Sequence, residues 1–241
     1  MMKKDKIYKS EDEKIYMELS DAIKYQIQRL DSLDIYTSKH THTVPIVTKK
    51  LCEKLAIDEP YTKLCINSAY LHDIGKIFID PKILQKNDKL NDKEYEMMKN
   101  HTIYGYNFCI AMPELRRYAK AARSHHENQN GTGYPDKLSG EQIPLNIDIV
   151  KIADIYDALT TRRQYKEECS RAEAVKIIYE EACGGFINMR VFKALLEIII
   201  EDMEDEVEQI NIAGNKKDIE NGQYILEDLD VITRIKEEIK T

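Results

Sequence analysis

The six histidines of this chain all lie between positions 40 and 126, and this confinement constrains the fold more than any other feature of the sequence. Six scattered histidines would be interpreted as surface residues or as satisfied core residues. Here they surround a His72-Asp73 pair and precede an Ala-Asp pair at 153–154. Imidazole and carboxylate together suit iron, manganese or zinc. We therefore expect a fold that gathers these segments around a metal site. The histidines are His40, His42, His72, His101, His125 and His126.

The periodicity of the apolar residues predicts an all-α fold. The chain has 241 residues with only nine glycines, six prolines and no tryptophan, which favours helices over a turn-rich β fold. Apolar side chains recur at helical spacing, and no segment alternates as a half-buried strand would. Asn91 and Ser170 each open a capping-box pattern. The predicted helices span 10–33, 37–56, 61–72, 91–101, 103–111, 113–127, 147–160, 170–183, 188–204 and 224–239, with a short helical turn at 80–81.

Charge and cysteine content exclude several classes of function. A formal charge of −7 gives no support for binding a DNA or RNA polymer, and a phosphate-bearing ligand would need metal ions and a few basic side chains. The five cysteines are odd in number and form no C-x-x-C pair, which fits reduced thiols in a cytoplasm. We find no apolar run long enough for membrane insertion and no signal peptide, so we expect a cytoplasmic protein.

The His72-Asp73 pair has the geometry needed to join two metal ions. Adjacent helical residues point about 100° apart, so both can reach one ion only near a helix end, and Gly75 provides such an end. The two oxygens of Asp73 could bridge two ions. Two ions about 3.5–4 Å apart activate a water and neutralise charge during attack on phosphorus. In this interpretation His40 and Asp154 join one ion, while His101, His125 and His126 supply the other.

Each residue also has an ordinary structural interpretation when taken alone. His72-Asp73 could be a hydrogen-bonded pair at a helix end, and His125-His126 could be a solvated pair. His101 could be a cation at a helix terminus. Lys76 could be a surface lysine, although it lies about one turn beyond His72 and could meet a phosphate oxygen. His42 points elsewhere, because it lies two residues from His40 on a helix. Only the joint occurrence of these residues favours the metal site.

Several ordered motifs together resemble the HD-GYP family, a branch of the HD metal-dependent phosphohydrolases. The similarity runs from about Asp34 to about Leu196. The long predicted loop, 128–146, contains one of these motifs, and loops of this length in compact domains are usually functional or disordered. The motifs are His72-Asp73-Ile74-Gly75-Lys76, His125-His126-Glu127, Gly133-Tyr134-Pro135, the segments 34–40 and 75–84, Ala153-Asp154 with Asp157 in 153–160, and the basic segment Arg163-Gln164-Tyr165-Lys166.

This resemblance implies an all-helical HD domain with a long functional loop that hydrolyses cyclic di-GMP to pGpG or GMP. It implies His40, His72, Asp73 and Asp154 as ligands of one ion, and Asp73, His101, His125 and His126 as ligands of another, often iron or manganese. Asp73 and Lys76 would be the catalytic residues. Substrate would be held by Lys76, Tyr134, Arg163 and Lys166.

Some positions depart from the family pattern. Members with three metal ions carry a glutamate where this chain has Tyr36, so we expect two divalent ions and no third. Asn130-Gly131 replaces the usual Asp-Gly before the loop motif. Asp148 stands where an arginine is usual, and Phe186-Ile187-Asn188 replaces Phe-Asp-Pro. We expect the last two departures to affect packing more than chemistry.

Two alternative functions stay open. The protein could be a receptor that binds cyclic di-GMP with little turnover, or an HD phosphohydrolase acting on another cyclic dinucleotide or nucleotide. The intact Gly133-Tyr134-Pro135 motif argues against the second alternative. We divide the chain into an N-terminal amphipathic helical extension (1–33), the catalytic domain (34–204) and an acidic helical tail (205–241). The terminal helices are the candidates for regulation or for forming a homodimer.

Overall fold

The computed structural model describes residues 11–161, 168–213 and 216–240, and in these residues every regular element is a helix. The prediction of an all-α fold is confirmed. The α-helices are α2 (Asp21–Asp31), α3 (Ile35–Lys54), α4 (Glu59–Leu71), α5 (Pro81–Leu84), α6 (Asp92–Lys99), α7 (His101–Ala111), α8 (Ala119–Ser124), α9 (Leu145–Thr160), α10 (Arg171–Cys183), α11 (Met189–Ala213) and α12 (Lys216–Glu238). Three 3₁₀ turns join them: η1 (Ile74–Phe78), η2 (Arg116–Tyr118) and η3 (Gly140–Gln142).

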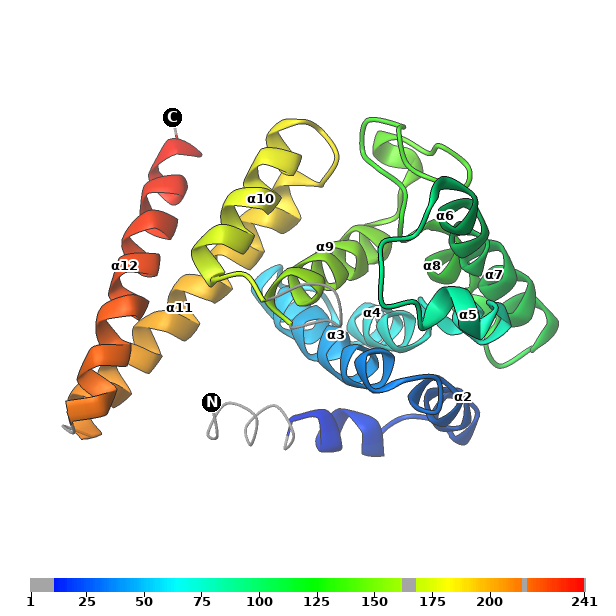
Figure 1. The fold of residues 1–241 in the computed structure, drawn as a ribbon, viewed down its shortest axis with the longest axis horizontal. Coiled ribbons are helices and arrows are strands. Elements are labelled where there is room, and N and C mark those ends of the chain that lie inside the picture. The colour runs from blue at the N-terminus through cyan, green and yellow to red at the C-terminus, as the bar shows by residue number, and fades with distance from the viewer. Residues whose placement is uncertain (1–10, 162–167, 214–215, 241) are drawn as a thin grey trace.

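Helices α3, α4 and α9 form the centre of the molecule (Figure 1). Helices α5 to α8 cover one end, while α10, α11 and α12 pack together at the other end. One apolar core lies among α3, α4 and α9 to α12, with Leu51, Val150 and Phe192 fully buried. A second core lies beneath the N-terminal helices and α4, with Ile27 and Leu71 at its centre. Burying these side chains stabilises the arrangement by about 1.5–3 kcal/mol for each large aliphatic residue.

The N-terminal segment is two helices, so the prediction of one helix over 10–33 was wrong. Residues 11–17 are helical, the chain turns at 18–19, and Ser20 is the N-cap of α2. Ile15, Leu19 and Ile23 keep their helical spacing across the break, and all three are buried. Both short helices therefore place their apolar side chains in the second core.

A partly buried ionic cluster fastens this N-terminal segment to α3. His42 Nδ1 lies 2.9 Å from Asp12 Oδ2, and His42 Nε2 lies 3.2 Å from the carboxylate of Asp31. Tyr70 on α4 donates its hydroxyl to Asp12 at 2.9 Å. Burial lowers the pKa of His42, but the two carboxylates outweigh it and raise that pKa to about 9. The imidazolium therefore holds helix 11–17 and α2 against α3.

The prediction of a helix over 113–127 was also wrong, because the chain turns at 112–115 and then forms η2 and the short α8. Leu115 and Tyr118 are buried in the second core, which holds the turn in place. Helix α8 ends at Ser124, so His125 and His126 follow the end of the helix. The capping boxes predicted at Asn91 and Ser170 are both present. In the described part of the chain, none of the helices has the length and apolar character of a membrane span.

Candidate metal centre

Close backbone packing at Gly75 brings the His72-Asp73 pair to the helices that carry the other histidines. Helix α4 ends at Leu71, His72 is its C-cap, and Asp73 precedes η1. A Cβ atom on Gly75 would lie only 1.8 Å from the carbonyl oxygen of His101. Any side chain at this position would therefore push η1 away from α7. The glycine lets Asp73 reach His101, which is the first residue of α7.

The first group of candidate ligands combines α3, the end of α4, and α9. His40 Nε2 lies 3.2 Å from His72 Nε2 and 3.4 Å from Asp154 Oδ1. Asp73 Oδ2 lies 3.6 Å from His40 Nε2 and 3.3 Å from His72 Nε2. The ligand atoms of His40, His72 and Asp73 all lie within 4.8 Å of one another.

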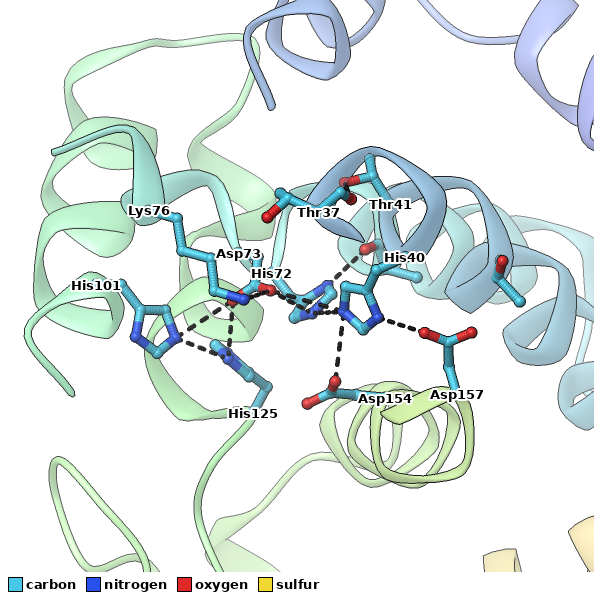
Figure 2. Close-up of polar contacts among 12 residues, drawn as sticks. Thr37, His40, Thr41, His72, Asp73, Lys76, His101, His125, Asp154 and Asp157 are labelled. Atoms are coloured by element: carbon cyan, nitrogen blue, oxygen red, sulfur yellow. Dashed lines mark hydrogen bonds and ion pairs between the residues drawn. The ribbon is translucent and has the colours of Figure 1, made fainter. Parts of the chain in front are cut away.

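The second group lies on the other side of Asp73 (Figure 2). His101 Nε2 lies 3.2 Å from His125 Nε2, and the ligand atoms of His101, His125 and His126 all lie within 4.8 Å of one another. Asp73 Oδ1 lies 3.4 Å from His101 Nε2 and 3.8 Å from His125 Nε2. One carboxylate oxygen of Asp73 thus faces each group, as a bridging ligand requires.

The ring nitrogens that face away from the centre have protein partners, and these partners determine whether the inward-facing nitrogens carry a proton or a lone pair. The Nδ1 atoms of His72, His101 and His125 lie 2.7, 2.8 and 3.0 Å from backbone carbonyl oxygens. A carbonyl oxygen can only accept, so each of these Nδ1 atoms carries the proton and donates it. In a neutral ring Nε2 then carries a lone pair. Two such lone pairs face each other at 3.2 Å between His101 and His125. A cation between them satisfies both, so this donor set fits a metal ion.

The electrostatics of the centre also favour the protonation states in which several of the candidate ligands bind metal ions. Burial opposes ionisation of Asp73, but Lys76, at 2.5 Å, and the adjacent His72 hold the pKa of Asp73 well below its usual value. Burial and neighbouring imidazoles keep the pKa of His125 well below its usual value and lower that of His126 to about 3. The carboxylate is therefore charged and these two imidazoles are neutral near pH 7, the states in which they bind metal ions.

A pocket of about 360 Å³ opens beside the second group and reaches Asp154. Tyr134, in the loop after α8, stacks on His126 with ring centroids 4.7 Å apart. Among the other predicted residues, Lys76 lies beside Asp73, His42 lies in the N-terminal ionic cluster, and Arg163 and Lys166 fall outside the described residues. The described lining comprises Tyr95, Lys99, His125, His126, Asn128, Thr132, Gly133, Tyr134, Lys151, Asp154, Ile155, Glu181 and Phe186.

The structure adds supporting residues to which the sequence interpretation gave no role. Asp157, one turn after Asp154 on α9, accepts a hydrogen bond from His40 Nδ1 at 2.6 Å. Its spacing from Asp154 was the available signal. Glu127 accepts hydrogen bonds from the backbone N–H groups of Asp136 and Leu138, at 2.6 and 3.0 Å, and so holds the loop. Such partners orient metal ligands and pocket loops.

Lys151 and Asp148 hold the loop and the α10–α11 turn against α9. The ammonium group of Lys151 donates to the carbonyl oxygens of Glu127 and Phe186, at 2.5 and 3.1 Å. Asp148 accepts from the side chain of Asn188 at 2.8 Å. Asp148 and Asn188 belong to the two departures from the family pattern that we expected to affect packing. They contact each other directly, away from the candidate ligands.

Comparison with known proteins identifies relatives of the whole central region. An HD domain family matches residues 24–185. A cyclic di-GMP phosphodiesterase of Thermotoga maritima is 33% identical over 192 residues, covering 77% of this chain and 52% of the relative. A 3′3′-cGAMP-specific phosphodiesterase 3 of Vibrio cholerae is 31% identical over 187 residues, covering 78% and 40%. This chain thus spans about half or less of the length of these curated relatives.

A solved structure supports the same relationship. Bd1817, a HDG"Y"P protein from Bdellovibrio bacteriovorus, matches with a TM-score of 0.56 and 25% identity, over 67% of this chain and 53% of that one. The family match at 24–185 contains both groups of candidate ligands, from His40 to Asp154. We conclude that this chain belongs to the HD domain family and, by its motifs, to the HD-GYP group within it.

Proposed function

We propose that this protein is a phosphodiesterase that hydrolyses cyclic di-GMP to pGpG or on to GMP, with water activated by two divalent transition-metal ions, iron or manganese. The observation that carries this proposal is the position of Asp73, whose two carboxylate oxygens face two separate groups of histidines. The relatives named for cyclic dinucleotide phosphodiesterase activity support the substrate class.

The residues of this chain would divide the work as follows. Lys76 holds its ammonium group beside Asp73 and would donate a hydrogen bond to a phosphate oxygen of the substrate. Tyr134 would close the pocket over the ligand, and Arg163 and Lys166 would meet guanine or phosphate. One ion would be held by His40, His72, Asp73 and Asp154, and the other by Asp73, His101, His125 and His126. We propose two ions and no third, because Tyr36 stands at the position where family members with three ions carry a glutamate.

The organisation of the whole protein is part of the same proposal. We assign catalysis to residues 34–204, with 1–33 as an extension and 205–241 as a tail, and the terminal helices as a homodimer contact. All five cysteines are free, and Cys52 and Cys65 are both buried. Free thiols are typical of a reducing compartment, so we place the protein in the cytoplasm.

The test is metal analysis joined to product analysis. The protein would be purified without oxygen, its metal content measured per chain, and cyclic di-GMP added while products are followed by chromatography. Two ions per chain, with pGpG or GMP appearing, are expected for the wild type. Asp73→Ala should bind less metal and produce neither product. Metal-loaded protein that binds cyclic di-GMP without converting it, with either ferrous or manganous ions, would contradict the proposal and indicate a receptor.

A second candidate substrate follows from the relative named for 3′3′-cGAMP. That relative matches a similar share of this chain to the one named for cyclic di-GMP, so the two substrates deserve a direct comparison. Parallel assays with cyclic di-GMP and 3′3′-cGAMP would give the ratio of their kcat/KM values. A larger kcat/KM for cyclic di-GMP supports it as the substrate, and a larger kcat/KM for 3′3′-cGAMP reverses the assignment.

A further inference from the structure

Helix α6 places two side chains in the pocket beside the candidate metal centre. It spans Asp92–Lys99 and leads, through one residue, into His101. Its start is fixed by the capping box between Asn91 and Glu94. Tyr95 and Lys99 are four residues apart, so they share one helical face, and both line the pocket.

Lys99 links Tyr95 to the stacked pair of Tyr134 and His126. The ammonium group of Lys99 lies 4.8 Å from the ring centroid of Tyr95 and 5.3 Å from that of Tyr134. The Tyr134 ring is nearly parallel to His126, at 23°. Tyr95 keeps 48% of its surface exposed, so its ring is open to a ligand that enters the pocket. An exposed aromatic ring beside a cation suits a flat, electron-rich heterocycle.

Glu96 adds the opposite charge to this group. Its carboxylate lies 2.6 Å from the ammonium group of Lys99, and its side chain is 68% exposed. Lysine donates to O6 and N7 of guanine, whereas adenine presents an amino donor at the position of O6. The N1–H and amino groups of guanine are donors that a carboxylate can accept. Adenine also offers N7 to a lysine and its amino group to a carboxylate, so a lysine and a glutamate side by side match the polar edge of either purine.

We propose that Tyr95 and Lys99, next to Tyr134, form a purine-binding shelf that holds one base of the substrate, with Glu96 holding Lys99 from outside the pocket lining. This inference rests on the proposed function for the identity of the substrate. The base stacks on the exposed Tyr95 ring, while Lys99 donates to an acceptor on its edge. The shelf lies next to His125 and His126 along the pocket wall, so a base bound there belongs to a nucleotide whose phosphate can reach the metal centre.

The test compares a substrate that has guanine with one that has none. Steady-state kinetics would be measured with cyclic di-GMP and with bis(p-nitrophenyl) phosphate for the wild type, Tyr95→Leu and Lys99→Met. Lys93→Met is the matched control, since Lys93 is an exposed lysine on α6 that does not line the pocket. We expect Tyr95→Leu and Lys99→Met to raise the KM for cyclic di-GMP about 5- to 50-fold, with kcat nearly unchanged. Both constants for bis(p-nitrophenyl) phosphate should stay within twofold.

Calorimetric binding of GMP and AMP makes the test independent of turnover. The wild type should bind both nucleotides, and Tyr95→Leu and Lys99→Met should each weaken their binding about fivefold or more. Unchanged KM and unchanged GMP affinity in both Tyr95→Leu and Lys99→Met would overturn the shelf. A wild type that turns over no cyclic dinucleotide overturns the proposed function instead. In that case, loss of GMP binding in the two variants still supports the shelf.

Discussion

Removing the charge of Asp157 should weaken the binding of one metal ion and leave the binding of the other unaffected. Asp157 is 2% exposed, and its carboxylate accepts from His40 Nδ1 at 2.6 Å and from Thr161 Oγ1 at 3.0 Å. In Asp157→Asn, the amide oxygen can still accept from His40, and the hydroxyl of Thr161 can rotate to accept from the new amino group. The hydrogen bond then survives, but it is no longer charge-assisted.

The expected size of this effect follows from the difference between the two kinds of hydrogen bond. A hydrogen bond to a charged group contributes about 1.5–3 kcal/mol and a neutral one about 0.5–1.5 kcal/mol, so the substitution costs roughly 1 kcal/mol of ligand orientation. This corresponds to about a fivefold to tenfold loss of affinity for the ion near His40. Asp157→Ala removes the acceptor altogether, and we expect a loss nearer 100-fold, the upper end for such supporting residues.

The assay is a titration of metal-free protein with Mn²⁺, followed by calorimetry and by the fraction of free ion. Asp148→Asn is the matched control, because Asp148 is also a buried carboxylate on α9 but bonds Gln129 and Asn188 instead of a site histidine. The control should lose thermal stability and keep both metal affinities. Wild-type affinities in Asp157→Ala, or equal losses in Asp157→Ala and Asp148→Asn, would refute the reasoning.

Three further predictions concern stability, pH and the loop. Gly75→Ala should destabilise the fold by about 3 kcal/mol or more, because its Cβ would clash with the carbonyl oxygen of His101. Gly140 has open space around it but a φ of 50°, so Gly140→Ala should cost about 1 kcal/mol. Thermal unfolding of the two variants measures this difference. His42 has a folded pKa of about 9, above its unfolded value of about 6.5, so its stabilisation is complete below pH 6.5 and is lost as pH rises through 9. With allowance for partial exposure of the ring, up to about 2 kcal/mol should disappear over that range, and His42→Gln should abolish this dependence in denaturant titrations. Glu127→Gln should loosen the loop and raise the KM for cyclic di-GMP severalfold with little change in kcat, because the two backbone N–H groups bond different carboxylate oxygens and one of these becomes an amino donor. An unchanged KM would contradict this role.

Local sequence signals predicted the helices that carry the candidate ligands. His72 and Asp73 were expected at a helix end, and α4 does end at Leu71. The capping patterns at Asn91 and Ser170 depend only on residues three apart, so they could be identified without tertiary information. The gathering of five of the six histidines near Asp73 could be predicted as well, because they surround the His72-Asp73 pair in the sequence, whereas His42 lies in the N-terminal ionic cluster.

Packing over long distances decided what the sequence did not reveal. The apolar spacing of Ile15, Leu19 and Ile23 continues across the break before α2, so periodicity alone could not indicate the break. Pro113 suits the first turn of a helix, but burial of Leu115 in the second core favours a turn there instead. The spacing of Asp157 from Asp154 places the two on neighbouring turns of a helix, but the partner of Asp157 lies 117 positions away and could not be identified from that spacing.

The separation of His40 from Asp157 also has a consequence for the order in which the protein matures. Their contact closes a loop of 117 residues, and closing a flexible loop of that length costs on the order of 4 kcal/mol of chain entropy. Contacts this distant form late in folding. During synthesis, His40 leaves the ribosome long before its partner on α9, so the centre is completed only after α9 has docked. Metal loading is then expected to follow folding of the central helices, and a slow, metal-dependent final phase should appear when the protein is refolded.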